Sequence, residues 1–552
     1  MTKAWLRLLL LTSFCLALDS AAGNSAITSQ DRLLVAADRD QDNWRLHGRT
    51  YDNQRFSPLT QINRDTVGRL TLIHTLHTGV ANSFEATPLA VDGVLYTVTA
   101  TNHVHAWDAV SGRQLWAWQP GKLDFTEACC GFQARGVALA YGKVYTALFD
   151  GHLVALDAKT GKLVWETDPA KTHPEPKHYY TYTLAPQVYD GMVIVGTAGA
   201  EYETRGMVEA YDAQTGSKLW EFRTTAAPGE PGGDTWGGDA WKFGGGSVWN
   251  TPAVDVKNGL LILATGNPNP DYQGETRPGD NAYTNSILAL HAKTGKLAWW
   301  YQEVPHDLWD YDASAPVMLF DVKDAGGKIV PAAGEAGKVG NVFIVNRLTG
   351  KLLVKSQPFV EQSANIFSPP SRAGVTILPG VSGGSLWQPP AFSPHTGYFY
   401  VLGSNVAMTF TTIDFPDSKP GGPWVGRHTG GVMKRADGPQ SGTLTAIEVN
   451  TGKIGWQYKS PQPMFGGVLA TASDLVFAGE VNGDFSAFDA ISGVKLWSHH
   501  FDHGVCSPPI TYRVKGVQYL AVGANGCRGG HVPQGSPLFT DEIAIFALSQ
   551  QQ

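Results

Sequence analysis

The chain has 552 residues, and its 42 Lys and Arg against 49 Asp and Glu give a formal net charge of −7 at pH 7. This balance argues against a nucleic-acid partner, because proteins that bind phosphate backbones concentrate basic side chains. The 63 Gly and 33 Pro, with 11% aromatic residues, are typical of an all-β chain with many turns.

The N-terminus has the features of a secretory signal peptide. Two basic residues precede an apolar run from Leu8 to Leu18, and small residues follow at 20–23. Such a run is too short to span a bilayer as a mature helix, and no later segment offers about 18 consecutive apolar residues. We therefore expect a signal peptide at residues 1–24. The mature protein is expected to be periplasmic, with one domain over residues 25–552 and no membrane span.

A short phrase recurs seven times along the chain. Each copy alternates apolar residues and turns at Thr/Ser-Gly, which five copies extend to Asp/Asn-x-x-Thr/Ser-Gly, and six copies end on Trp. This pattern predicts a β-hairpin. Most turn glycines are 41 to 55 residues apart, the spacing of four-stranded propeller blades. The copies occupy residues 104–116, 153–165, 208–220, 288–299, 342–354, 445–456 and 485–497.

The longest interval between turn glycines, 102 residues, leaves room for one degenerate blade around residues 392–403. The sequence therefore predicts an eight-bladed β-propeller with Trp-ended repeats. We expect each terminal Trp to pack one blade on the next. The insertions at 222–250, 268–285 and 355–385 are expected to be loops on the faces.

Five cysteines bear on the redox environment, and export permits disulfides. Cys129 and Cys130 are adjacent, so a bond between them would close no loop of the unfolded chain. The residues alone leave open whether each pairs elsewhere or is buried as a thiol, or whether the adjacent pair has a role of its own. For Cys506 and Cys527 we favour an additional disulfide over free buried thiols. Without a C-x-x-C-H motif we expect no fused c-type haem.

Four motifs make the chain similar to a known family: CC-x4-RG at 129–136, GAE-x3-RG at 199–206, TGNPNP at 265–270 and PHDLWD at 305–310. Together with the repeats, they resemble the pyrroloquinoline quinone (PQQ) dependent alcohol dehydrogenases, which are periplasmic eight-bladed propellers. The resemblance runs from residues 48–63 to 539–548. It implies that Cys129 and Cys130 form a ring disulfide on one face of PQQ, with Trp249 as the aromatic platform for the other.

The resemblance also implies further cofactor contacts. PQQ carries three carboxylates, which need several donors to be buried at tolerable cost. Three positions depart from the family: Ala198 replaces a frequent Ser, Leu386 a frequent Asn and Phe465 a Trp, and Thr197 is expected to compensate for Ala198. The matching cofactor positions are Glu85, Arg135, Thr183, Gly199, Ala200 and Lys338.

Glu201, Asn267 and Asp310 match the family's metal ligands, an oxygen-only set that suits a hard cation. If the Asp-Tyr-Asp segment is extended, Asp312 points to the same side as Asp310, and Asp307 to the other. An acid at 312 resembles the lanthanide-dependent branch, so we favour a lanthanide(III) ion over Ca²⁺. A solvated or Arg-paired Asp312 is the structural alternative.

The implied reaction is oxidation of a primary alcohol to an aldehyde. The metal polarises the C5 carbonyl of PQQ, Asp310 is the catalytic base that takes the hydroxyl proton, and hydride passes to C5. A separate soluble cytochrome c is the expected electron acceptor, and a homodimer the expected oligomer. The alternatives are a non-catalytic periplasmic scaffold propeller and a decayed relative that binds PQQ poorly. The residues do not identify the alcohol.

Overall fold

The computed structural model describes residues 29–123, 130–173, 180–202, 204–324, 326–413, 430–527 and 539–549. The predicted signal peptide and Cys129 lie outside these residues. Strands dominate the described chain, which confirms the all-β prediction. The helical elements are short: α1 (Ser29–Val35), α2 (Pro169–Thr172), and the 3-10 turns η1 (Val67–Arg69), η3 (Ala200–Tyr202), η4 (Gly233–Thr235) and η5 (Ala240–Phe243).

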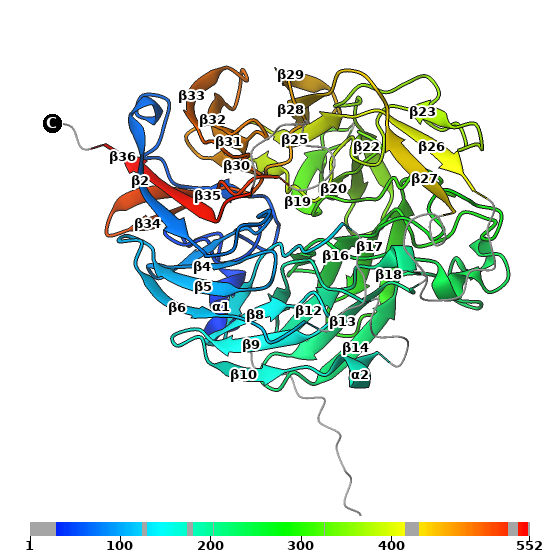
Figure 1. Cartoon of the computed structure of the whole chain (residues 1–552), viewed down its shortest axis with the longest axis horizontal. Helices are drawn as coiled ribbons and strands as arrows, with labels where there is room; N and C mark the ends of the chain where they lie inside the picture. Colours follow the sequence, from blue (N-terminus) through cyan, green and yellow to red (C-terminus); the bar gives the residue numbers. More distant parts are fainter. Residues whose placement is uncertain are drawn as a thin grey trace, which may run out of the picture.

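The strands form eight sheets of four or five strands, arranged around a centre as Figure 1 shows. The first five in chain order are β3 (Leu89–Val91), β4 (Val94–Val98), β5 (Val104–Asp108), β6 (Gln114–Trp118); β7 (Ala138–Ala140), β8 (Lys143–Ala147), β9 (Leu153–Asp157), β10 (Leu163–Glu166); β11 (Gln187–Tyr189), β12 (Met192–Gly196), β13 (Met207–Asp212), β14 (Lys218–Arg223); β15 (Ala253–Asp255), β16 (Leu260–Ala264), β17 (Ser286–His291), β18 (Leu297–Gln302); and β19 (Met318–Lys323), β20 (Ile329–Ala336), β21 (Val342–Asn346), β22 (Leu352–Lys355).

Three further large sheets complete the set. They are β24 (Ala391–Ser393), β25 (Tyr398–Asn405), β28 (Ser441–Glu448), β29 (Ile454–Ser460); β1 (Phe56–Ser57) with β30 (Val468–Thr471), β31 (Leu475–Gly479), β32 (Asp484–Asp489), β33 (Lys495–His500); and β2 (Leu70–His77) with β36 (Glu542–Leu548), β35 (Val517–Gly523), β34 (Ile510–Val514). Each of the seven sequence repeats supplies two antiparallel strands of one sheet, β5 and β6 being the first such pair.

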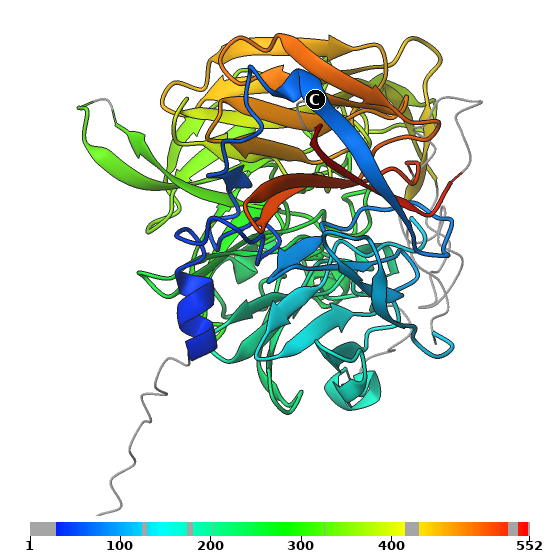
Figure 2. The same cartoon turned by 90° about the vertical axis from the view of Figure 1, so that its left-hand side faces the viewer.

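The eighth sheet comes from the two ends of the chain, not from residues 392–403 as the sequence analysis predicted. That segment forms β24 and β25, which pair with the repeat at 445–456 in one sheet. The 102-residue interval between turn glycines is therefore long because it contains the first two strands of that sheet and further inserted residues, not a separate blade. In the closing sheet, β2 pairs antiparallel with β36, and the two strands lie side by side in both views (Figures 1 and 2).

Neighbouring sheets meet where a terminal tryptophan covers the turn glycine of the next repeat. A Cβ built on Gly216 (φ 72°) would lie 2.7 Å from the ring of Trp165, and the Trp165 Nε1 donates to Ala213 O at 3.2 Å. Glycine is required there, because the close approach leaves no room for a side chain. The same ring contact joins Trp116 to Gly161, Trp220 to Gly295, Trp299 to Gly350 and Trp456 to Gly493.

Two predictions about individual segments have clear outcomes. The segment 355–385 is not all loop, because its β-branched stretch forms β23 (Val375–Ile377), which joins β26 (Met408–Thr412) and β27 (Gly431–Arg435) in a three-stranded sheet. Cys506 and Cys527 form a disulfide with their Cα atoms 5.5 Å apart, which confirms the favoured pairing. No helix in the described chain is long and apolar enough to cross a membrane.

Candidate active site

A cavity of about 410 Å³ collects most of the predicted site residues. They lie in loops next to the inner strands of successive sheets, from Glu85 before β3 to Lys338 between β20 and β21. Of the predicted residues, Ala200 and Asn267 are buried but do not line the cavity. Those that line it are Glu85, Cys130, Arg135, Thr183, Gly199, Glu201, Trp249, Asp310, Asp312 and Lys338.

Arg135 is the central cation at one end of the cavity. Its guanidinium pairs with Glu85 at 3.1 Å, donates to Thr183 Oγ1 at 2.8 Å and to Trp249 O at 3.1 Å, and lies 4.9 Å from the Trp249 ring centre. Although burial lowers the pKa of Arg135, the Glu85 charge opposes that shift. The buried Nε of Arg135 has no hydrogen-bond partner in the described chain, so one charged donor is unused.

Cys130 and Trp249 are expected to contact the two faces of a planar cofactor, and both residues line the cavity. Cys130 is disulfide-bonded and has a positive φ of 64°. Because Cys129 lies outside the described residues, the ring disulfide between the two stays a prediction.

Trp387 is a lining residue that the sequence analysis did not identify. It is 9% exposed, it stacks on Phe465 with ring centres 5.4 Å apart, and its indole N–H has no hydrogen-bond partner within the described residues. Phe465 itself is buried behind it and does not line the cavity, whereas Leu386 does. Trp387 thus provides an indole donor near the position where Phe465 lacks one.

The compensation expected from Thr197 is wrong. Its Oγ1 accepts from Met207 N at 3.1 Å and the side chain does not line the cavity, because Thr197 points into the sheet pairing. Beside Ala198, the hydroxyl-bearing residues that do line the cavity are Thr181, Thr183 and Ser247. Residues 197 and 198 directly follow β12 (Met192–Gly196), and of the two only Ala198 lines the cavity.

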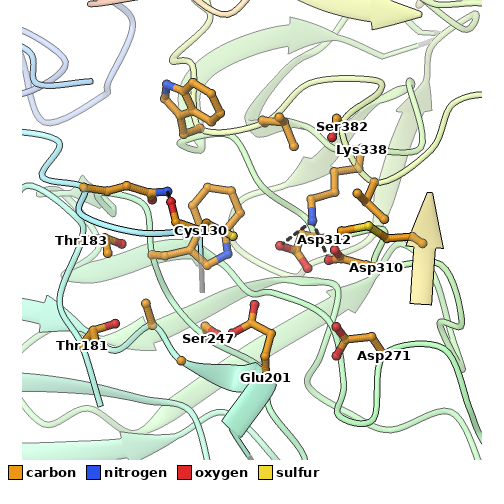
Figure 3. Close-up of a pocket in the computed structure, with 18 of the residues that line it drawn as sticks. Cys130, Thr181, Thr183, Glu201, Ser247, Asp271, Asp310, Asp312, Lys338 and Ser382 are labelled. Atoms are coloured by element: carbon orange, nitrogen blue, oxygen red, sulfur yellow. Dashed lines mark hydrogen bonds and ion pairs between the residues drawn. The ribbon is translucent and has the colours of Figure 1, made fainter. Parts of the chain in front are cut away.

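The acidic end of the cavity is organised by Lys338. Its Nζ lies 2.5 Å from Asp310 Oδ1 and 3.2 Å from Asp312 Oδ2, so the two carboxylates converge as predicted (Figure 3). The segment is not extended, however, since Asp310 has a left-handed φ of 60°. Burial opposes the Lys338 charge, but the two carboxylates together raise its pKa above the usual range. Asp312 is therefore Lys-paired, neither solvated nor Arg-paired.

Asp307 lies apart from this group and has a structural role. Its Oδ2 accepts from Asn285 Nδ2 at 3.0 Å and from Tyr311 N at 2.8 Å, and its Oδ1 accepts from Trp309 N at 2.9 Å. These bonds hold the loop that carries Asp310. Asp307 does not line the cavity, in agreement with its predicted separation from Asp310 and Asp312.

Glu201 faces the same space from η3 (Figure 3). Burial raises the pKa of Glu201, and the nearby Asp312 adds to that rise. Its Oε2 is shielded from solvent and has no hydrogen-bond partner within the described residues. A buried carboxylate oxygen without a donor is costly, and a cation would remove that cost.

Asn267 stands behind the carboxylates. Its backbone N donates to Asp312 Oδ1 at 2.5 Å, and its side-chain Nδ2 donates to Pro268 O at 3.2 Å and to Asp271 Oδ1 at 2.8 Å. Asp271 is a fourth acid at this end of the cavity, beside Glu201, Asp310 and Asp312, and was not among the predicted site residues. Its position directly after the TGNPNP motif was the available signal.

The donor set fits a hard cation in its chemistry, because the oxygens come from carboxylates and an amide. In the described chain, no three Asp, Glu, His or Cys side chains are already arranged to hold a metal ion. The positive charge between Asp310 and Asp312 is instead the Lys338 ammonium. Closing around an ion therefore requires these side chains to move toward one another. PQQ also fits, since Arg135 Nε and Trp387 Nε1 are unused donors in the cavity.

Comparison with known proteins assigns the class. Residues 44–364 and 355–520 match the PQQ family described as glucose/ethanol/alcohol dehydrogenase, beta-propeller domain. The chain belongs to this family and is a PQQ-dependent alcohol dehydrogenase, which confirms the resemblance found in the sequence.

Two curated relatives are from Pseudomonas putida. The chain is similar to quinohemoprotein alcohol dehydrogenase ADH-IIG, with 35% identity over 88% of this chain and 73% of that one. It is also similar to quinoprotein alcohol dehydrogenase PedH, with 32% identity over 88% of this chain and 86% of that one.

Two solved structures share the fold. Quinohemoprotein alcohol dehydrogenase from Comamonas testosteroni has a TM-score of 0.86 at 32% identity, covering 95% of this chain and 83% of that one. A europium-containing methanol dehydrogenase has a TM-score of 0.84 at 30% identity, covering 94% of this chain and 100% of that one. The propeller fold is thereby established.

Proposed function

We propose that this protein is a periplasmic quinoprotein that oxidises primary alcohols to aldehydes with a lanthanide(III) ion favoured over Ca²⁺. The observation that carries the proposal is the meeting of Glu201, Asp310 and Asp312 in one cavity with Cys130 and Trp249. The europium named for the structural relative and the extra acid at 312 support the choice of metal. When bound, PQQ would supply a hydride acceptor and the cation a Lewis acid.

The chain's own residues have distinct roles in this proposal. Asp310 takes the proton from the alcohol hydroxyl, and Lys338 keeps the Asp310 carboxylate oriented at 2.5 Å. Glu201, Asn267, Asp310 and Asp312 would hold the cation. Burial raises the pKa of Asp310 well above its usual range, and a cation beside it favours the ionised form that can accept a proton.

The other residues on the cavity wall would bind the cofactor and shield the site from water. Arg135 and Trp387 offer unused N–H donors to anionic or carbonyl groups of the cofactor. Glu85, Thr183 and Gly199 line its surroundings, and Ala200 is buried next to Gly199. The apolar side chains on the cavity wall exclude water and set the room for the alcohol. They are Val381, Leu386, Met408 and Met433.

We further propose that the eight large sheets are eight blades of one domain over residues 25–552. The docking of terminal Trp residues on neighbouring turn glycines supports this reading. Residues 1–24 are proposed to be the signal peptide of a periplasmic protein, with a separate soluble cytochrome c as acceptor and a homodimer as the assembly.

The experiment is dye-linked oxidation of methanol, ethanol and butanol by protein reconstituted with PQQ and either La³⁺ or Ca²⁺. We expect activity with La³⁺ that is lost in Asp310→Asn, while the absorbance of bound PQQ is retained. Asp312→Ala should abolish the La³⁺-dependent activity.

Two results would count against the proposal. Activity with Ca²⁺ alone that Asp312→Ala leaves unchanged would overturn the choice of metal. Absence of activity with both metals, together with no bound PQQ, would favour a decayed relative or a scaffold. The unused donors of Arg135 and Trp387 argue against decay, because each costs free energy unless a ligand fills it.

A further inference from the structure

Asp271 is buried at the cation site without a charged partner of its own. Its side chain is 3% exposed, lines the cavity and accepts a hydrogen bond from Asn267 Nδ2 at 2.8 Å. No ion pair joins it to a Lys or Arg within the described residues. The nearby Arg277 donates instead to backbone oxygens, including Pro270 O at 3.0 Å and Asp271 O at 3.5 Å, and its charge acts on Asp271 without an ion pair. A buried, unpaired carboxylate of this kind needs a reason to be retained.

Four carboxylates face one space at this end of the cavity. Figure 3 shows Asp271 and Glu201 on one side of an opening, with Asp310 and Asp312 across it. Burial raises the pKa of Asp271 well above its usual range, and Asp310, Glu201 and Asp312 each add to that rise. Lys338 and the nearby Arg277 are the cations that oppose the shift. Among the side chains that line this end of the cavity, four ionised acids and one ammonium carry a formal charge of −3.

Asn267 connects two of these carboxylates. Its backbone N donates to Asp312, and its Nδ2 donates to Asp271. A carboxylate accepts only from the NH₂ end of an amide, so Asp271 fixes which way the Asn267 amide points. Its Oδ1 is thereby kept on the side away from Asp271 Oδ1, as the oxygen available to a cation. Asp271 therefore bears on the site through both its charge and its hydrogen bond.

We propose that Asp271 is a fourth carboxylate of the cation site and that it shifts the site's preference toward trivalent ions. The inference rests on the proposed function. A trivalent ion is attracted to each added carboxylate half again as strongly as a divalent ion at the same distance. Each acid that faces the ion therefore favours a trivalent ion over Ca²⁺, and Asp271 adds one such acid to Glu201, Asp310 and Asp312.

The test is isothermal titration of LaCl₃ and CaCl₂ into metal-free protein loaded with PQQ, comparing wild type with Asp271→Asn. We expect the La³⁺ affinity of the variant to fall on the order of tenfold or more, and its Ca²⁺ affinity to fall less. Asp239→Asn is the matched control, because it removes the same charge from a side chain that is 75% exposed. The control should bind both ions as the wild type does.

Folding is checked separately by the melting temperature of each metal-free protein and by its PQQ absorbance. Asp271→Glu restores the charge and should recover part of the La³⁺ affinity that Asp271→Asn loses. An Asp271→Asn protein that is folded, retains PQQ and binds La³⁺ as tightly as the wild type overturns the inference. An equal loss for La³⁺ and Ca²⁺ overturns it too.

The outcomes also separate this inference from the proposed function. A wild-type protein that binds La³⁺ and oxidises alcohols, with an unchanged Asp271→Asn variant, contradicts only the role of Asp271. A wild-type protein that binds neither PQQ nor La³⁺ contradicts the proposed function itself.

Discussion

Arg135 and Glu85 are a buried ion pair, each 4% exposed, in which one partner also has a donor to spare. Removing one member of such a pair leaves the other charge buried alone, which is more costly than removing both. The pair therefore separates two contributions of Arg135: its balance of the Glu85 charge and its capacity to bind an anion.

We predict that Arg135→Met loses PQQ binding and destabilises the fold by about 3–5 kcal/mol. The double variant Arg135→Met/Glu85→Gln should recover much of the stability, because no charge is left unpaired, but it should not recover PQQ. Denaturant unfolding and PQQ absorbance measure the two effects. A double variant as unstable as the single one would contradict this view of the pair.

Glu335 is a second buried acid, and it lies beside Glu303. Burial raises the pKa of Glu335 to about 8, and a hydrogen bond from Glu303 and backbone N–H groups partly offset that rise. The folded protein then binds more protons than the unfolded chain between pH 4.5, the ordinary value, and about 8. Stability contributed by this group falls as pH rises through that window and is constant above it.

Glu335→Gln should remove this dependence, because the amide does not titrate and its oxygen can still accept from Ala315 N, now 2.9 Å from Glu335 Oε1. We expect the variant to lose less melting temperature than wild type between pH 5 and 8, measured on metal-free protein. Glu361→Gln, at an exposed position, is the control. If the melting temperatures of Glu335→Gln and wild type fall equally between pH 5 and 8, the raised pKa of Glu335 does not cause the pH dependence.

The residues that the sequence located best are those within motifs. Arg135, Glu201, Asp310 and Asp312 lie in one cavity as predicted, because the motifs specify loops next to inner strands. Asp271 was missed although it directly follows the TGNPNP motif, and Trp387 was missed because its local sequence does not differ from that of a core aromatic residue. Their role depends on which loops the sheet arrangement brings together, and residue spacing does not contain that information.

At the scale of elements, the repeated hairpin contacts the hairpin of the next repeat through its terminal tryptophan. Its turn glycine has a positive φ and receives the terminal tryptophan of the preceding repeat, as Gly216 receives Trp165. The repeat at 342–354 lacks a Trp, and Val354 takes the corresponding place against Gly452. The pattern thus predicted strands and turns well, whereas the course of 392–403 depended on a pairing between distant segments.

Gly216→Ala should reveal this docking. The added Cβ meets Trp165 at 2.7 Å, so we expect the variant to lose about 1–3 kcal/mol more than Gly191→Ala. Gly191 is the matched control, since its φ of 78° is similarly left-handed but no atom lies within 4 Å of its Cβ position. Denaturant unfolding measures both. Equal losses would mean that the Trp165 contact adds nothing beyond backbone strain.

At the scale of the whole molecule, the closing sheet determines whether the ring is complete. It joins β2 to β36, β35 and β34, and the Cys506–Cys527 disulfide fastens the chain before β34 to the chain after β35. The sequence predicted the disulfide but not the closure, because β2 and β36 carry no copy of the repeat.

We predict that Cys506→Ser/Cys527→Ser lowers the free energy of unfolding by about 3 kcal/mol, from the entropy of a loop with a sequence separation of 21 residues. Fluorescence-monitored denaturation under oxidising conditions measures it. A variant as stable as the oxidised wild type would show that the closing sheet does not need the covalent link.

The pairing of β2 with β36 also determines when the closing sheet can form during synthesis of the chain. Thr71 in β2 bonds to Ala547 in β36, 476 residues further along the chain. At typical rates of synthesis, roughly half a minute to a minute and a half passes between the appearance of these two partners. During that interval β2 has no partner strand, and the closing sheet cannot form. Such a delay would agree with the proposed export, because an exported chain passes through a translocation channel before it folds.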